Sequence, residues 1–196
     1  MAKKTVLIKL IGQIISGGNG SGDEGSLVKL SAPIIRFIES GKASREEYNP
    51  LLLLSSRGGS AETAMSLYAL LKQLPRPLTA LGMGQIESAA IFVYLAAKKR
   101  LAMPTTTFMI HNGNFSMKDI PKDEIMSVAR SCVLTNEVQM KVVAKECGLS
   151  LAQVRKWFSG GKSFSAKEAV KYGIVHEIVE DSVFKEMDEV LSIEDL

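Results

Sequence analysis

The sequence predicts an α/β fold built on a parallel sheet. Segments with the pattern of strands alternate along the chain with segments that have the spacing of helices. Residues 51–54 form a continuous leucine run, which is typical of a strand covered on both faces. Residues 61–74 follow with an apolar stripe, which indicates an amphipathic helix. This alternation favours right-handed crossovers between parallel strands.

The first quarter of the chain begins this alternation. Residues 6–15 alternate and are rich in β-branched side chains, so they predict the first strand. Residues 16–26 are rich in Gly, Ser and Asn and predict a surface loop without the signature of a phosphate site. Residues 27–40 have helical spacing, which Pro33 is expected to interrupt, and 41–50 are polar and predict a loop.

The middle of the chain predicts two further strand–helix pairs. The helix of residues 61–74 stops at Pro75, and residues 78–83 predict a short strand. Residues 89–97 are Ala-rich and apolar, which indicates a buried helix. Residues 98–100 are basic and are expected to form its exposed end, where cations suit the helix dipole.

The last part of the chain continues the pattern. The expected elements are strands at 101–103 and 105–110, a long helix at 122–147, helices at 150–158 and 165–172, and a strand at 174–179. Gly148 is expected to cap the long helix, and Ser165 with Glu168 matches a capping box. The acidic segment after the last strand is expected to be a solvated helix or disordered.

Length and composition predict a single domain over residues 1–196. Of the 196 residues 46% are hydrophobic and 23% charged, enough to bury an ordinary core. The net charge of +3 comes from scattered basic residues, which argues against nucleic-acid binding. No apolar run predicts a membrane span or a signal peptide, so a cytoplasmic protein is expected. Cys132 and Cys147 lack metal-ligand spacing, so we expect reduced structural thiols and neither metal nor cofactor.

Ser88 and His111 carry the strongest chemical signal. Ser88 lies between a glycine-rich strand end and the predicted helix of residues 89–97, where a nucleophile is held rigidly beside the free amides of a first helical turn. His111 ends the predicted strand of residues 105–110. Because sites in open α/β folds gather at the carboxyl ends of strands, the pair predicts acyl transfer with serine as nucleophile and histidine as base.

Backbone amides near Ser88 can complete such a site. Gly58 and Gly59 follow the strand of residues 51–54, and without a Cβ their backbone can approach a substrate carbonyl closely. Ala89, directly after the nucleophile, can supply a second amide. Each donor to a developing oxyanion typically contributes about 3 kcal/mol to lowering the barrier. His176, on the predicted last strand, is expected to be structural.

Four segments in this order resemble the proteolytic subunit of the Clp protease, a self-compartmentalised serine peptidase. They are the Ser-Ser-Arg-Gly-Gly-Ser turn at 55–60, Met-Gly-Gln-Ile-Glu-Ser-Ala-Ala at 83–90, the segment 99–111 ending in the histidine, and 164–175. The resemblance covers roughly residues 6–180. It implies a crotonase-like ββα superhelix in which Ser88 is the nucleophile, His111 the base, and Gly58 and Ala89 the oxyanion donors.

The resemblance also implies an assembly. The region 113–147 resembles the handle through which two rings of the family stack, commonly with seven subunits in each. Peptides or unfolded proteins are the implied substrates, and an ATPase unfoldase is the implied partner. Only five residues precede the first predicted strand, where the family has the axial segment that meets the ATPase, and this speaks against that partner. An oligomer is expected because apolar residues of the long helix need cover, namely Ile125, Val128, Val138, Val142 and Val143.

The chain departs from the family at the third residue of the triad. Aligning residues 164–166 with the family's pattern places Gly161 where an aspartate is expected. Loss of the orienting acid costs about 10⁴ in turnover in chymotrypsin-type enzymes. The groups that could orient His111 instead are Glu87, Asp119, Asp123, Ser163 and Ser165. In addition, Asn112 and Gly113 replace the family's Gln-Pro, and the loops at 16–26 and 41–50 look inserted.

Three functions stay open at this point. An active serine peptidase is favoured because Ser88, His111 and the oxyanion positions are present. A catalytically weak or silent subunit, acting as a scaffold or partner for an active relative, is favoured by Gly161. An enzyme acting on acyl-CoA thioesters is allowed by the fold, although a serine beside a histidine suits peptide hydrolysis better than enolate chemistry.

Overall fold

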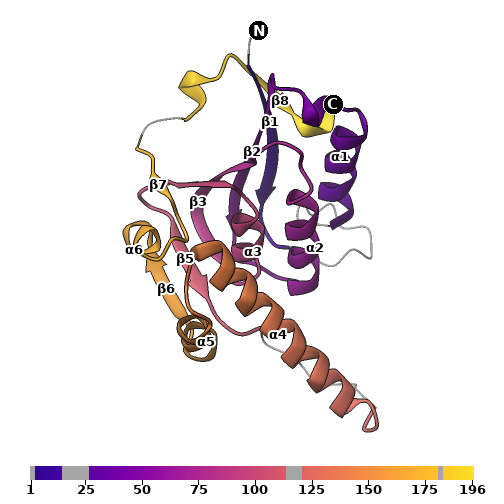
Figure 1. Cartoon of the computed structure of the whole chain (residues 1–196), viewed down its shortest axis with the longest axis vertical. Coiled ribbons are helices and arrows are strands. Elements are labelled where there is room, and N and C mark those ends of the chain that lie inside the picture. The colour runs from indigo at the N-terminus through magenta and orange to yellow at the C-terminus, as the bar shows by residue number, and fades with distance from the viewer. Residues whose placement is uncertain (1–2, 15–26, 114–120, 181–182) are drawn as a thin grey trace.

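A sheet of mainly parallel strands forms the centre of the molecule (Figure 1). The computed structural model describes residues 3–14, 27–113, 121–180 and 183–196. The strands are β1 (Lys4–Ile11), β2 (Tyr48–Ser56), β3 (Thr79–Glu87), β4 (Lys99–Ala102), β5 (Thr107–Ile110), β6 (Lys162–Ser165), β7 (Glu177–Ile178) and β8 (Glu189–Ser192). Their order is β6-β5-β3-β2-β1-β8, and β4 joins β3 to β7. Of the described pairs, β5 with β6 is antiparallel and the others are parallel, which confirms the predicted α/β class.

Helices follow the strands as the alternation predicted. They are α1 (Leu27–Glu39), α2 (Ala61–Leu71), α3 (Ala90–Leu95), α4 (Ile125–Cys147), α5 (Leu151–Gly160) and α6 (Ala166–Lys171), with short 3₁₀ turns at Lys42–Ser44, Val183–Glu186 and Ile193–Asp195. The capping box of α6 is present in full, with Ser165 Oγ accepting from the Glu168 amide. Gly148 ends α4 in the left-handed conformation, as expected. The predicted loop at 16–26 lies outside the described residues.

Strand β3 changes partner halfway along its length. Its first half pairs with β4, from Thr79 opposite Lys99 to Gly82 opposite Ala102. Its second half pairs with β5, where Glu87 stands opposite Met109. The strand therefore runs beyond the predicted end at residue 83, and its extension carries the chain to Ser88 beside the end of β5.

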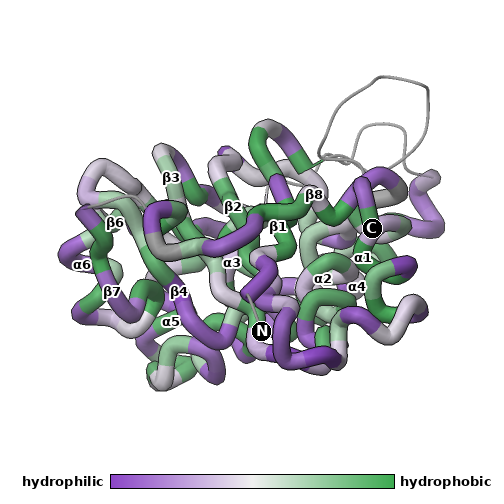
Figure 2. The backbone as a smooth tube through the Cα atoms, turned by 90° about the horizontal axis from the view of Figure 1, so that it is seen from above, coloured by the Kyte–Doolittle hydropathy of each residue, from purple (hydrophilic) through white to green (hydrophobic). Residues whose placement is uncertain are grey.

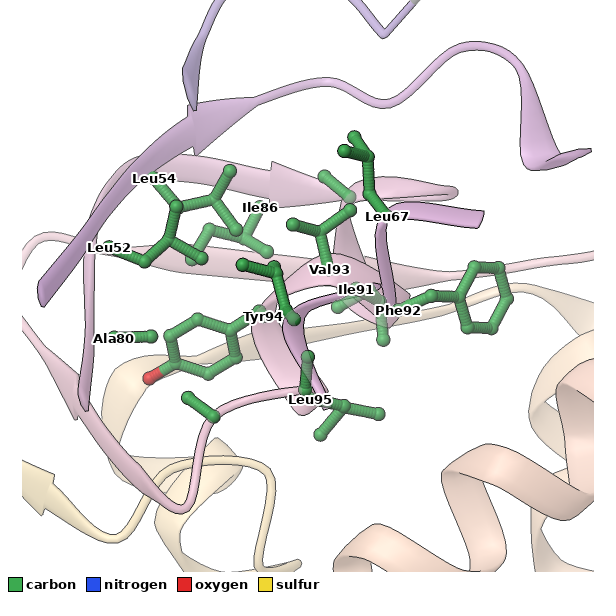
Figure 3. Close-up of a cluster of buried hydrophobic side chains, with 14 of the residues drawn as sticks. Leu52, Leu54, Leu67, Ala80, Ile86, Ile91, Phe92, Val93, Tyr94 and Leu95 are labelled. Atoms are coloured by element: carbon green, nitrogen blue, oxygen red, sulfur yellow. The ribbon is translucent and has the colours of Figure 1, made fainter. Parts of the chain in front are cut away.

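Helix α3 is buried on all sides and anchors the core. All six of its residues are buried, which explains its unbroken apolar sequence. Figure 3 shows several of them packed among Leu52 and Leu54 of β2, Leu67 of α2 and Ile86 of β3. Tyr94, with a fully buried side chain, donates its hydroxyl proton to the carbonyl of Leu101 at 2.8 Å. Figure 2 shows hydrophobic stretches of the chain along the central strands and also in the helices around them.

Helix α4 extends away from the sheet beyond its packed end (Figure 1). Met140 and Val143, toward its C-terminus, belong to the core. Val143 was expected to need a partner's cover, and this is wrong because its side chain is fully buried within the chain. The large apolar side chains that α4 does leave exposed are Met126, Val133, Leu134 and Val138.

Two further expectations are wrong. Pro33 does not interrupt α1, which runs through it, because the buried side chains of Ile34 and Phe37 hold the second half of the helix against the core. The acidic C-terminal segment is neither a solvated helix nor, in its described part, disordered. It adds β8 in parallel beside β1 and buries Ile193, which is 5% exposed.

Arg100 was expected at an exposed helix end, and this is also wrong. It lies in β4 with 3% of its surface exposed. Its guanidinium donates to the carbonyls of Ala97, Glu146, Gly173 and Ile174 at 2.8 to 3.1 Å. A buried guanidinium is tolerated because its donors are satisfied, and here it ties α3, α4 and the turn after α6 together.

Candidate functional site

Ser88 occupies a strained turn between β3 and α3. Its φ of 54° makes it the one non-glycine residue with a positive φ among those that the structure describes. Its amide donates to the Met109 carbonyl at 2.8 Å, and its own carbonyl accepts from the Ile91 amide at 3.1 Å. A left-handed conformation at a residue with a Cβ costs about 1 to 3 kcal/mol and persists only where the surroundings impose it. Such strained strand-to-helix turns are the setting in which α/β hydrolases expose a nucleophilic serine.

The turn at Gly58 packs directly on the Ser88 turn. A Cβ added to Gly58 would lie 2.7 Å from the Glu87 carbonyl oxygen, 2.8 Å from Ser88 Cβ and 2.9 Å from the Ala89 nitrogen. The φ of Gly58 is 93°, so both the space and the conformation demand glycine. The adjacent Gly59 is held by a parallel bridge to Ile14. Of the two glycines predicted from the sequence to allow a close backbone approach, Gly58 therefore lies against Ser88, and Gly59 lies against Ile14.

The amides around Ser88 differ in their availability. The Gly58 amide donates to the hydroxyl of Ser56 at 3.1 Å, a contact that the sequence analysis missed although Ser56 stands in the same turn. Within the part of the chain that the structure describes, the amides of Gly59 and Ala89 make no hydrogen bond. An unpaired backbone donor beside a nucleophile is what stabilisation of an oxyanion requires. Of the three amides predicted as oxyanion donors, those of Gly59 and Ala89 are therefore unpaired within the described residues, and that of Gly58 is paired with Ser56.

His111 follows the last residue of β5 and is half-buried. Because β3 and β5 are neighbouring parallel strands with Glu87 opposite Met109, Ser88 and His111 leave the sheet at the same edge. The amide that follows the histidine, that of Asn112, donates to the Phe158 carbonyl at 3.0 Å and fixes the chain there. Ser88 and His111 both belong to the described residues, and no hydrogen bond joins them there. In enzymes without substrate, catalytic hydrogen bonds are often long and shorten only in the substrate complex.

Gly161 lies beside His111. The antiparallel register of β5 and β6 puts Ile110 opposite Lys162, so the residues just beyond them, His111 and Gly161, face each other. A Cβ added to Gly161 would lie 3.9 Å from the Cβ of His111. The structure therefore places Gly161 at the position from which a third residue could orient the histidine, and this residue has no side chain.

The described substitutes named from the sequence have other partners or are exposed. Glu87 pairs with Arg57 at 3.5 Å. The hydroxyl of Ser165 donates to Glu168 at 2.8 Å as part of the α6 cap. Ser163 is exposed on β6, and Asp123 is exposed before α4. Asp119 lies outside the described residues.

His176 is engaged with Arg100 rather than with the Ser88 site. Its Nδ1 accepts from the Arg100 amide at 3.1 Å, and its own amide donates to the Arg100 carbonyl at 2.8 Å. Burial, followed by the positive charges of Arg100, Lys98 and Lys99, lowers the pKa of His176. The basic residues 98–100 were the sequence signal for the contact between Arg100 and His176. The sequence analysis missed this contact because it assigned these residues to an exposed helix end.

Among the residues with described positions, no group of three or more His, Cys, Asp or Glu side chains is arranged to hold a metal. None of the described helices combines the length and the apolar character that crossing a membrane requires. Burial raises the pKa of the Cys147 thiol to about 12.

Comparisons with known proteins identify a family. The sequence profile of the Clp protease family matches residues 31–182, a range that contains Gly58, Ser88, His111 and Gly161. The ATP-dependent Clp protease proteolytic subunit 2 of Treponema denticola is 28% identical over 158 residues, covering 78% of this chain and 77% of that protein. Subunit 3 of Rhizobium etli is 30% identical over 130 residues, covering 65% and 66%.

A solved structure extends the likeness to the fold. It is described as a point mutant of ClpP1 from Listeria monocytogenes and superposes with a TM-score of 0.70 at 27% identity, covering 90% of this chain and 91% of that one. The crotonase-like α/β fold that the resemblance implied is therefore confirmed.

Proposed function

This chain belongs to the Clp protease family, and from that premise we propose that it is a serine peptidase that cleaves peptides or unfolded proteins, with Ser88 as nucleophile and His111 as base. The observation that carries the proposal is the left-handed turn at Ser88, packed on Gly58 and hydrogen-bonded to β5. A structural N-cap serine needs no such strain, because caps have extended backbone.

The chemistry follows the acyl-transfer scheme. His111 accepts the proton of Ser88 Oγ as the oxygen attacks the peptide carbonyl, and the resulting oxyanion is held by the free amides of Gly59 and Ala89. His111 then protonates the leaving amine, which departs as the C–N bond breaks. A water molecule gives a proton to His111 and attacks the acyl-enzyme, and the returning proton releases Ser88.

The lack of a side chain at Gly161 sets the expected rate. With no carboxylate at residue 161, no acid among the described residues is placed to fix the tautomer of the His111 ring or to stabilise the charge that it gains in the transition state. Loss of this acid elsewhere costs about 10⁴ in turnover, while a serine site with its oxyanion donors keeps measurable activity. We therefore expect a slow peptidase. The competing role, a silent subunit that acts as a scaffold or partner, is favoured by the same glycine.

We further propose that the protein acts as a homo-oligomer assembled through α4. This helix has an exposed apolar surface, whose contact with water is unfavourable in free energy. It is formed by the side chains of Met126, Val133, Leu134 and Val138. A second copy would cover it with the same surface, since self-complementary contacts are the commonest way in which chains associate.

Fluorophosphonate labelling tests the proposed nucleophile. The probe phosphonylates an activated serine with loss of fluoride, so intact mass should show one adduct on the wild type and none on Ser88→Ala. Ser66→Ala is the matched control, because the Ser66 hydroxyl is exposed on α2 and donates to the Glu62 carbonyl. An unlabelled wild type that assembles normally would reject the peptidase and favour the scaffold role.

A further inference from the structure

A cleft of about 280 Å³ lies at the ends of α2 and α3 that are remote from Ser88. The two helices pack against each other (Figure 1). Both begin beside the Ser88 turn, because α2 starts two residues after Gly59 and α3 starts directly after Ala89. The cleft is lined by the last residue of α2, by the chain that follows it, and by Ala96 and Lys98 after α3. It is therefore separate from the proposed catalytic site.

The charged residues that line this cleft are all basic. They are Lys72, Arg76 and Lys98, and none of the lining residues is acidic. Lys72 is already paired with Glu146 at 2.9 Å. Among the ion pairs of the described residues, neither Arg76 nor Lys98 has a carboxylate partner. Two positive charges therefore line the cleft without an opposite charge to balance them.

Arg76 has a hydrogen-bond donor that the fold does not use. Its Nε is buried and makes no hydrogen bond within the described residues. Buried polar groups are nearly always paired, and an unpaired donor on a charged group destabilises the folded state. The buried guanidinium of Arg100, by contrast, donates to four backbone carbonyls. The unused Nε of Arg76 therefore indicates an acceptor that the chain itself does not supply.

The backbone brings Arg76 and Lys98 to the same cleft. Arg76 stands between Pro75 and Pro77, whose rings fix their own φ and restrict the residue before each of them. The amide of Lys98 donates to the carbonyl of Leu78, two residues beyond Arg76, at 2.9 Å. The backbones of both cations are therefore fixed before a ligand arrives, which lowers the entropic cost of binding.

The rest of the lining is apolar. Leu74, Leu78 and Ala96, which are buried residues, line the cleft together with Leu71 and the two prolines. A guanidinium is a planar fork that matches the oxygens of a carboxylate or a phosphate, and apolar walls favour a carbon body. The cleft thus offers a place for a charged head and a place for an apolar group next to it.

From these observations we infer that the cleft binds a small organic anion, with a phosphate or carboxylate head on Arg76 and Lys98 and a short apolar body against the leucines of the lining. The head accepts from the buried Nε of Arg76 and balances the two unpaired charges, and such charge-assisted hydrogen bonds are the strong ones. The inference does not depend on the proposed peptidase, because the cleft and Ser88 lie at opposite ends of α2 and α3.

A ligand-observed NMR titration of the full-length protein tests the inference with three aromatic probes of similar size, namely phenyl phosphate, benzoate and neutral benzamide. Both anions should bind with a dissociation constant at least about tenfold lower than that of benzamide, which brings no charge to the two cations. Tighter binding of phenyl phosphate than of benzoate identifies a phosphate head, and the reverse order identifies a carboxylate head. Binding of either anion should weaken as the ionic strength rises.

Two variants assign the binding to this cleft. Arg76→Gln should weaken the binding of the tighter anion at least about tenfold, because it removes the guanidinium. Lys98→Gln should weaken it as well, and because Lys98 is exposed this variant tests the site even if Arg76→Gln folds poorly. Arg36→Gln is the matched control, since Arg36 is exposed on α1 and lies outside the lining, and it should leave the affinity unchanged.

Three results would overturn the inference. The first is an equal affinity for benzamide and for the two anions, and the second is the absence of anion binding up to about 10 mM. The third is a loss of affinity in Arg36→Gln as large as that in Arg76→Gln and Lys98→Gln, or no loss in any of them. Anions would then respond to the positive charge of the whole surface, and the cleft would not be their site.

Discussion

Gly161 faces His111 across the ends of β5 and β6, and a Cβ at Gly161 would lie 3.9 Å from that of the histidine. A carboxylate on this Cβ would be placed to accept a hydrogen bond from the imidazole. Residue 161 is therefore the position at which an acid can be introduced beside His111.

Gly161→Asp should therefore raise peptide turnover. An acid at this position would fix the tautomer of His111 and stabilise its positive charge, so we expect kcat to increase at least about tenfold, within the roughly 10⁴ that the acid can supply. The measurement is steady-state hydrolysis of a fluorogenic peptide. The φ of 67° at this residue strains any side chain, so Gly161→Asn is the control with equal strain and no charge. An equal gain in both variants would contradict the explanation.

Gly58→Ala should remove both activity and stability. Its methyl group would lie within 3 Å of backbone atoms of Glu87 and Ala89, so the Ser88 turn must move. We expect a loss of about 2 to 4 kcal/mol in the free energy of unfolding, measured by urea denaturation. Gly160→Ala, in α5 with no atom within 4 Å, should be neutral or slightly stabilising. A tolerated methyl group at Gly58 would show that the two turns do not pack as described.

The free energy of unfolding should fall as the pH drops below about 7. Burial and neighbouring cations lower the pKa of His176 in the folded protein, so the unfolded chain binds a proton first, near its ordinary pKa of about 6.5. The stability is thus present above that pH and is lost as the pH falls toward the lowered pKa. His176→Gln should flatten the pH dependence of the free energy of unfolding below about pH 7, measured by denaturant titrations. An unchanged slope would mean that other groups cause it.

Charges on the apolar surface of α4 should dissociate the proposed oligomer. Leu134→Glu places a carboxylate on an exposed apolar position, so light scattering should report a smaller species at micromolar concentration. Lys141→Glu is the control, because it changes the charge at an exposed polar position of the same helix. If the wild type is itself a monomer, assembly through α4 is refuted without recourse to either variant.

The elements with strong local signals were predictable from the sequence. Ser165 and Glu168 predicted the start of α6, and Gly148 predicted the end of α4. The leucine run predicted that β2 is buried. Each of these features depends on neighbouring residues or on simple periodicity. The positions of Ser88 and His111 at the carboxyl ends of two parallel strands also predicted that both lie at the same edge of the sheet.

What escaped prediction depends on contacts between distant segments. The sequence predicts that Arg100 is a solvated cation, because the carbonyls that accept from its guanidinium come from α4 and from the turn after α6, far away in the chain. The strand β8 exists because β1, at the opposite end of the chain, offers it an open edge. The free amide of Gly59 and the bound one of Gly58 differ only through the hydroxyl of Ser56, a distinction that no spacing rule contains.

The change of partner within β3 has a mechanical consequence. The half of the strand that leads to Ser88 is bonded to β5, which leads to His111 and is itself bonded to β6, which begins after Gly161. These three chain ends share one ladder, separate from the pairing of the first half of β3 with β4. If the sheet flexes at Gly84, whose φ of 64° marks the bend between the two halves, serine, histidine and the vacant acid position tilt together. Their mutual geometry is then kept during such a movement, while Ser56 opposite Ile86 links this part of the sheet to β2.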